Sequence, residues 1–283
     1  MRRTKKSEYI ITVMIFTLFM SQSTVASNNV TKTTELDVVG LYNPLGLSIA
    51  GKAYWRNEYH QDASPLWDGL YYQAGGQIRL TPAYSQAGFH IEWSPVAVTK
   101  FRLQYDRLYF TGAFGSLLSF SSADQPFDDN DLEAREGEEI SAYASRMALG
   151  ITLQARFNKY IVRNILEQID YEFPGNGPFY LEREFELLLA TDDDVLSNQL
   201  YLLVEDKNEI RNQYIGPYHD YVHVGKSDLT RERLGVTWLQ QYKQLIAGFK
   251  KPRWYIQAGY YLQDPNRKDE FYFILGVGGD FEF

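Results

Sequence analysis

The stretch EFYFILGVGGDFEF, from Glu270 to Phe283, decides the fold class of this chain. Its residues fall into two alternating sets, one of which is apolar and aromatic while the other ends in Asp280 and Glu282. A period of two residues is typical of a β-strand whose two faces meet different surroundings. Aromatic residues at both ends of the apolar face suit a strand that crosses a lipid layer with two interfaces. The stretch therefore predicts a strand with lipid on one side and water on the other.

This stretch resembles the C-terminal strand of bacterial outer-membrane β-barrel proteins, which ends in an aromatic residue, usually Phe, after alternating apolar positions. Phe281 and Phe283 match that pattern. In this class the strand closes the barrel and carries the signal that the assembly machinery reads, so the resemblance implies that role for Phe281 and Phe283. The resemblance covers the segment and the general pattern of the chain, and it indicates a porin-like class without a specific family.

The composition agrees with a barrel. The chain has 283 residues, of which 16% are aromatic, including 22 Tyr, and it has no Cys. Its mean hydropathy of −0.37 excludes a helical membrane protein but permits strands that are apolar on one face only. Without Cys there is neither a disulfide framework nor a site for lipid attachment.

The N-terminal segment predicts export. Arg2, Arg3, Lys5 and Lys6 precede an apolar run that ends at Met20, and Thr24-Val25-Ala26 supplies small residues before Ser27. This order is typical of a secretory signal peptide over residues 1–26, with an uncleaved anchor as the alternative. Because the segment holds four basic residues and one acidic residue, its removal lowers the formal net charge from −8 to −11. An acidic exported chain is a poor candidate for binding nucleic acid.

Alternation along residues 27–283 predicts one closed antiparallel transmembrane β-barrel of about 12 strands, with 10 as the alternative. In hydrocarbon an unpaired backbone group costs several kcal/mol, so a spanning sheet must close on itself. The long segments 111–139 and 206–230 are expected outside the cell, and tight turns near residues 95, 158 and 192 in the periplasm. The strands are expected over residues 35–42, 47–56, 70–81, 87–94, 99–109, 145–157, 160–173, 179–189, 195–205, 231–242, 253–262 and 270–283.

The parity of residues 160–173 is ambiguous, since Arg163 and Glu167 interrupt the set that holds Ile161 and Ile165. A β-bulge would place the charged and apolar residues on different faces.

Charged residues of the polar set are expected to line the lumen. Two interpretations stay open for them: a lattice of ion pairs that fills a narrow barrel, or a constriction that selects solutes by charge. The lumen-lining candidates are Arg79, His90, Glu92, Lys100, Arg102, Asp106, Glu182, Glu184 and Glu186.

An enzyme is the alternative to a channel. Barrel phospholipases and lipid A deacylases use a Ser activated by a His two residues away, but His90-Ile91-Glu92 has Glu where Ser is needed. His219-Asp220 and His223 lie in an expected outer loop, as in omptin-type proteases, but without the omptin spacing. The simpler interpretation is that His219 and His223 are two loop residues without a shared role, and a metal site formed by both is the alternative.

The sequence thus predicts a monomeric barrel in the outer membrane of a Gram-negative bacterium that serves as a porin-like channel or transporter for small solutes. A hydrolase acting on lipid or peptide and a structural barrel with a plugged lumen are the alternatives. The expected partners are outer-membrane lipid, lipopolysaccharide and the barrel assembly machinery, and neither a cofactor nor a metal is expected.

Overall fold

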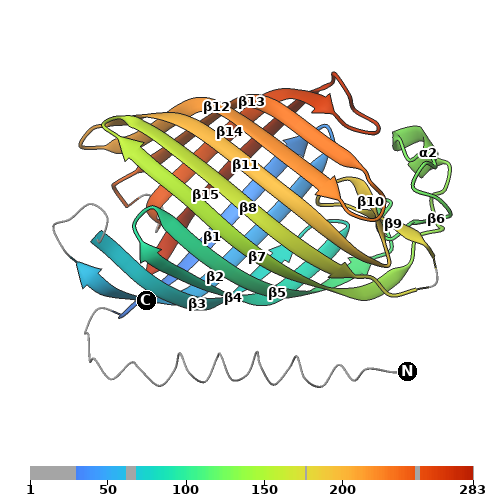
Figure 1. Cartoon of the computed structure of the whole chain (residues 1–283), viewed down its shortest axis with the longest axis horizontal. Coiled ribbons are helices and arrows are strands. Elements are labelled where there is room, and N and C mark those ends of the chain that lie inside the picture. Colours follow the sequence, from blue (N-terminus) through green and yellow to red (C-terminus); the bar gives the residue numbers. More distant parts are fainter. Residues whose placement is uncertain (1–29, 62–67, 176, 246–248, 283) are drawn as a thin grey trace.

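The computed structural model describes residues 30–61, 68–175, 177–245 and 249–282. Twelve antiparallel strands form a closed barrel in which each strand pairs with two neighbours, and β1 pairs with β15 to complete the ring (Figure 1). Closure leaves no unpaired sheet edge, as a membrane-spanning sheet requires. The wall strands, in order around the barrel, are β1 (Val30–Tyr42), β2 (Gly46–Gln61), β3 (Asp68–Leu80), β4 (Tyr84–Val96), β5 (Thr99–Thr111), β7 (Ser141–Phe157), β8 (Tyr160–Glu172), β11 (Asp192–Lys207), β12 (Arg211–Val224), β13 (Thr230–Tyr242), β14 (Lys250–Gln263) and β15 (Phe271–Glu282).

Side chains alternate between the two faces of the wall as the sequence predicts. On β15, Leu275 and Val277 are exposed on the outer face, while Tyr272 and Ile274 are buried inside the barrel. Other exposed apolar side chains, such as Trp55 on β2, extend this outer face into an apolar belt. Among the described residues, no helix is long and apolar enough to cross a membrane. The closed wall and its apolar belt are those of an outer-membrane β-barrel.

The two ends of the barrel differ. The segments 112–140 and 173–191 leave the wall at one end, which we call the loop end, and the short turns at 97–98, 158–159 and 208–210 lie at the other, the turn end. Bacterial barrels place short turns in the periplasm and long loops outside, so the loop end faces the exterior. In Figure 1 the loop end carries α2 (Asp129–Glu133), and β15 runs from the loop end to the opposite end.

A second, three-stranded sheet lies at the loop end in the order β10-β9-β6. It consists of β6 (Ser119–Phe120), β9 (Phe179–Glu182) and β10 (Leu187–Ala190). The strand expected over residues 179–189 is therefore wrong as a wall strand, because these residues form a separate hairpin. The predicted loop 206–230 is also wrong, since it contains the turn 208–210 and all of β12. Residue 192 lies at the loop end, where β11 begins, and not at a periplasmic turn.

The proposed bulge in residues 160–173 is wrong as well. β8 pairs in continuous register with β7 and with β11. Tyr160 and Val162 are exposed on the outer face, so the opposite parity, with Ile161 and Arg163, faces the interior. The interior of this barrel therefore accepts apolar side chains beside charged ones.

The predicted assembly signal is only partly within the described residues. Phe281 lies near the end of β15, where its ring packs against Phe249 at a centroid distance of 4.4 Å. Phe283 lies outside the described residues, as does the predicted signal peptide. The role of the two Phe residues in assembly stays a prediction.

Candidate functional site

A hairpin inside the barrel defines the candidate site. It consists of β9, the turn 183–186 and β10, and the chain enters it after β8 and returns to the wall at β11. Glu186 adopts a left-handed backbone conformation, with φ of 57°, at the end of the turn. Glu182, Glu184 and Glu186 thus lie at the tip of an inward-folded loop and not on the wall as predicted.

Apolar contacts hold the hairpin against one side of the barrel. Tyr180, Phe185, Leu187 and Leu189 pack into a buried cluster with side chains of the wall strands. Leu187 and Leu189 have no exposed surface. The wall residues of this cluster include Leu108, Phe110, Tyr171, Val195 and Val222. The cluster closes this part of the lumen at the loop end.

The segment 112–140 covers the hairpin from outside. β6 pairs with β9, and Leu118, Phe120 and Phe127 pack against Leu181 and Leu188 of the hairpin. The buried area on both faces of the small sheet makes the hairpin part of the folded structure rather than a surface loop.

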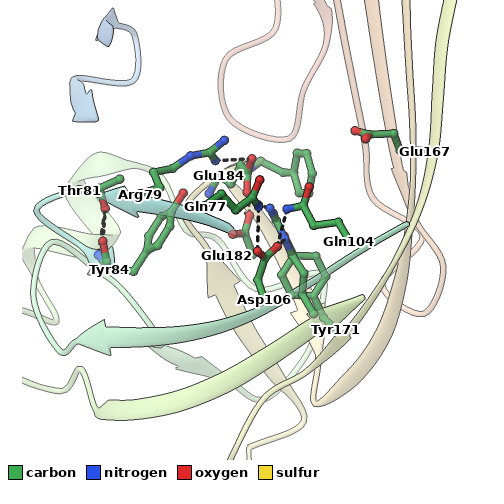
Figure 2. Close-up of polar contacts among 12 residues, drawn as sticks. Gln77, Arg79, Thr81, Tyr84, Gln104, Asp106, Glu167, Tyr171, Glu182 and Glu184 are labelled. Atoms are coloured by element: carbon green, nitrogen blue, oxygen red, sulfur yellow. Dashed lines mark hydrogen bonds and ion pairs between the residues drawn. The ribbon is translucent and has the colours of Figure 1, made fainter. Parts of the chain in front are cut away.

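Glu184 joins the hairpin tip to the wall. Its carboxylate lies 2.7 Å from Nη1 of Arg79 on β3 (Figure 2). It also accepts a hydrogen bond from Arg146 on β7. Arg146 forms a second ion pair, 3.0 Å long, with the buried Asp106 on β5. The charges of Arg146 and Arg79 outweigh the effect of burial and lower the pKa of Glu184 to about 2. Glu184 is therefore ionised and held by two cations.

Asp106 is the centre of the buried polar contacts beneath the tip. It accepts hydrogen bonds from Gln77 at 2.8 Å and from Gln104 at 2.5 Å, as Figure 2 shows. Gly88 on β4 leaves the space for it, because an added Cβ would collide with the Asp106 carboxylate and the Tyr105 carbonyl. A charge buried in this way is stable only when its partners satisfy it.

Glu182 lies behind Glu184 and is fully buried. One carboxyl oxygen accepts hydrogen bonds from the backbone N–H groups of Glu184 at 2.9 Å and Phe185 at 2.7 Å. The other oxygen has no hydrogen-bond partner among the described residues. Burial and the negative charge of Glu184 raise the pKa of Glu182 to about 7. The tip therefore contains one firmly ionised carboxylate and one that titrates near neutral pH.

Glu186 secures the tip on its other side. Its carboxylate lies 2.8 Å from Arg183 in the same turn and 3.7 Å from Arg267 in the loop between β14 and β15.

The other predicted lumen residues lie apart from the hairpin and closer to the turn end. His90 is buried with Nε2 3.2 Å from Gln73, and Glu92 accepts a hydrogen bond from the Tyr71 hydroxyl. Lys100 lies over the Tyr71 ring at 5.6 Å, and Arg102 is 3.8 Å from Glu167. The structure thus separates the predicted set into a group at the hairpin tip and a group deeper in the barrel. A role in solute selection stays a prediction for both groups.

Two cavities meet at the hairpin tip. A cavity of about 540 Å³ opens at the loop end, between the hairpin and strands β1 to β4, β14 and β15. A smaller cavity of about 150 Å³ lies deeper in the lumen. Arg79 and Glu184 line both cavities. Their ion pair therefore separates an outer vestibule from an inner chamber.

Several interior residues are absent from the predicted lumen-lining set. Arg146 belongs to the polar parity of its strand, so alternation alone could have found it. Lys52 was on the polar parity of β2 and lines the inner chamber. Asp220 stands in the sequence only as the neighbour of His219 in an expected loop, and nothing there indicates its buried ion pairs with Arg231 at 3.2 Å and Arg233 at 2.7 Å.

The remaining His residues of the enzyme hypothesis lie on the outer face of the wall. His219 on β12 is 2.7 Å from Glu232 on β13. His223 lies 3.2 Å from the Thr230 hydroxyl and 4.0 Å from Asp228, which is too far for a hydrogen bond. The described residues include no group of three or more His, Asp or Glu side chains suited to hold a metal ion. Within the described part of the chain, His223 does not form a triad of hydroxyl, imidazole and carboxylate.

Comparison with known proteins found no matching family model and no matching curated protein. Among solved structures, the β domain of the Bordetella autotransporter BrkA is 11% identical, with a TM-score of 0.45 over 89% of this chain and 99% of that chain. LpxR from Salmonella typhimurium is 8% identical, with a TM-score of 0.45 over 87% and 99%. An outer membrane channel from Pseudomonas putida F1 is 9% identical, with a TM-score of 0.42 over 90% and 97%.

These similarities concern the fold, and at TM-scores below 0.5 they carry no information on activity. The closed wall, the lipid-facing belt and the polar interior together identify the chain as an outer-membrane β-barrel whose loop end is partly filled by its own segments.

Proposed function

We propose that the protein is a porin-like channel for small solutes that the β9–β10 hairpin holds closed. The observation that carries the proposal is the barrier between the two cavities, which consists of the Arg79–Glu184 ion pair. These side chains keep 33% and 23% of their surface exposed, so the barrier is polar and in contact with the cavities. Small movements of charged side chains or of the loop that carries one of them are enough to gate such a constriction.

Single-channel conductance in planar bilayers tests the proposal. We expect small or brief currents from the wild-type protein and more frequent opening of Glu184→Gln, which weakens the contact with Arg79 but keeps the hairpin. Replacing residues 179–190 by a short Gly-Ser linker should give a large, steady current. The wall tolerates this replacement because β8 and β11 pair directly with each other. Arg135→Gln, on the outer covering segment, is the control and should behave as wild type. No current from any variant at any voltage would show that the protein is not a channel.

A barrel with a permanently plugged lumen is the second candidate. The observation in its favour is the apolar packing of the hairpin, in which Leu187 and Leu189 are fully buried. Current from the linker variant alone, with none from wild type or Glu184→Gln, would favour this candidate.

A hydrolase that acts on lipid or peptide is the remaining alternative, and its only support is the contact between His223 and Thr230. An assay of lipid and peptide hydrolysis on His90→Ala, His219→Ala and His223→Ala tests it. Activity in wild type that His223→Ala abolishes would establish the alternative.

A further inference from the structure

We infer that the vestibule binds small amphipathic anions, namely monocarboxylates with an apolar body, with the carboxylate at Arg79 and the body against β1 and β15. The inference names the solute class of the channel and, for transport but not for binding, rests on the function proposed above. Three features of the interior carry it: an apolar wall, a cation with free donors, and an unbalanced positive charge below.

The vestibule has an apolar wall in a barrel whose interior is mostly polar. Val39 and Leu41 on β1 and Ile274 on β15 line it, and Leu45 and Phe114 border it at the loop end. Its volume of about 540 Å³ falls in the range of pockets that hold small organic molecules. Apolar side chains that face a water-filled cavity gain free energy when an apolar ligand covers them. This wall favours a solute with a ring or short alkyl chain over a fully hydrated ion.

The floor of the vestibule offers a cation. Glu184 accepts from Nη1 of Arg79, and a guanidinium has five N–H donors, so donors remain for a ligand carboxylate. A carboxylate bound there would compete with Glu184 for Arg79. Glu184 would keep its ion pair with Arg146, so its charge would stay balanced. Binding of an anion therefore weakens the barrier between vestibule and chamber without leaving a buried charge unpaired.

The inner chamber carries an excess of positive charge. Four basic side chains, those of Lys52, Arg79, Arg102 and Arg146, line it together with the acidic Glu167 and Glu184. Asp106 neutralises Arg146 from outside the lining, which leaves one positive charge in excess.

Among these basic residues, Lys52 forms no ion pair or hydrogen bond with any described residue, and Glu35 and Asp37 act on it from longer range while they pair with Arg253. Glu35 lies opposite Lys52 on β1, but its carboxylate accepts from the Tyr54 hydroxyl at 2.9 Å and lies 3.7 Å from Arg253. A cation without a hydrogen-bonded counter-ion in a narrow lumen attracts anions and repels cations. A solute that leaves the vestibule toward Lys52 should thus be negatively charged.

Binding of three ligands that share one ring tests the inference on the purified protein in detergent. Benzoate, benzylamine and benzyl alcohol are anionic, cationic and neutral, and isothermal titration calorimetry measures the affinity of each. We expect benzoate to bind about tenfold more tightly than the other two ligands. Arg79→Gln and Lys52→Gln should each lower the affinity for benzoate about tenfold. Lys32→Gln, on the outer face near the turn end, is the matched control and should leave the affinity unchanged. Equal affinity for the three ligands, or no effect of either variant, would overturn the inference.

A second variant tests the apolar wall without removing a charge. Leu41→Asn should weaken benzoate and leave the weaker binding of acetate unaltered, because acetate lacks the ring. If Leu41→Asn weakens both anions equally, the ring does not lie against β1 and the assigned site is wrong.

Bilayer recordings separate this inference from the proposed function. A conducting wild-type protein that neither binds benzoate nor prefers chloride over potassium would remain a channel but contradict the solute class. Benzoate binding that depends on Arg79 and Lys52, in a protein that carries no current, would support the site and contradict the channel.

Discussion

At the scale of single residues, Asp220 balances the buried positive charges on the inner faces of β12 and β13. It is fully buried between Arg231 and Arg233, and Gln199 also donates to it. Asp220→Asn would leave two buried guanidinium groups without a counter-charge, which costs about 3–5 kcal/mol of the free energy of unfolding. Urea unfolding followed by Trp fluorescence in detergent micelles measures this loss. Asp228→Asn, at an exposed position on the same side of the barrel, should change the free energy by less than about 0.5 kcal/mol.

Glu182 should make the hairpin sensitive to pH. Its pKa in the folded protein is raised to about 7 from an ordinary value of 4.5 by burial and by the charge of Glu184. Between these two values the folded state holds a proton that the unfolded state has lost, so the stability that Glu182 contributes is complete below about pH 4.5 and is lost as pH rises to about 7.

Hydrogen exchange of peptides from the hairpin, corrected for the intrinsic pH dependence of exchange, measures this effect. Exchange should be faster at pH 8 than at pH 5 in wild type. Glu182→Gln keeps the side chain neutral and should remove the difference. An equal pH response in wild type and in Glu182→Gln would show that another group is responsible.

At the scale of elements, alternation predicted the wall strands well but not their surroundings. The pattern of residues 179–189 is real, yet its apolar side chains pack inside the barrel against Leu108 and Phe110 and not against lipid. A period of two shows only that the two faces of a strand differ, and both a lipid belt and a buried protein core satisfy it. The position of the candidate site could therefore not be predicted from the sequence. Several of its charged residues were predicted correctly as residues of the interior.

β12 is a wall strand that alternation did not predict, because its sequence does not alternate clearly. Its outer face carries His219 and His223, and Gly216 and Pro217 lie in its middle, so the segment lacks a continuous apolar face. Gly and Pro normally lower the preference for a strand, but here pairing with β11 and β13 holds the segment in place. Tertiary pairing overrides local preference at this strand.

β15 allows a direct test of the lipid-facing belt. Val277 is exposed on the outer face near the middle of the strand, where Arg in a barrel wall costs about 2–4 kcal/mol. We expect Val277→Arg to lower the free energy of unfolding in lipid vesicles by this amount. Gln257→Arg, on the inner face of the neighbouring β14, should have a much smaller effect. Equal effects of the two variants would contradict the assignment of the faces.

At the scale of the whole molecule, the predicted count of 12 strands is confirmed although one of its members was wrong. The hairpin 179–189 was counted in the wall and β12 was not, so the two errors cancelled. Closure followed from physics, because an open sheet is not stable in hydrocarbon. The hairpin that fills part of the lumen could not be predicted in the same way, because its position depends on contacts between segments far apart in the chain, such as Arg79 with Glu184.

The closed ring also bears on the oligomeric state. Every wall strand finds both of its neighbours in the same chain, so no second copy is needed to satisfy the backbone. We expect a monomer in native mass spectrometry of detergent-solubilised protein, and precipitation when the detergent is removed. A stable trimer, or a protein that stays dissolved without detergent, would contradict this expectation.

The direct pairing of β8 with β11 has a consequence for the history of this chain. Glu172 and Asp192 face each other across the two strands, although 19 residues separate them in the sequence. The whole intervening segment can be lengthened, shortened or exchanged while the register of the surrounding strands stays the same. Proteins that share an ancestral barrel of this kind can therefore diverge in the segment that fills it. We expect homologues of this chain to differ most between Glu172 and Asp192.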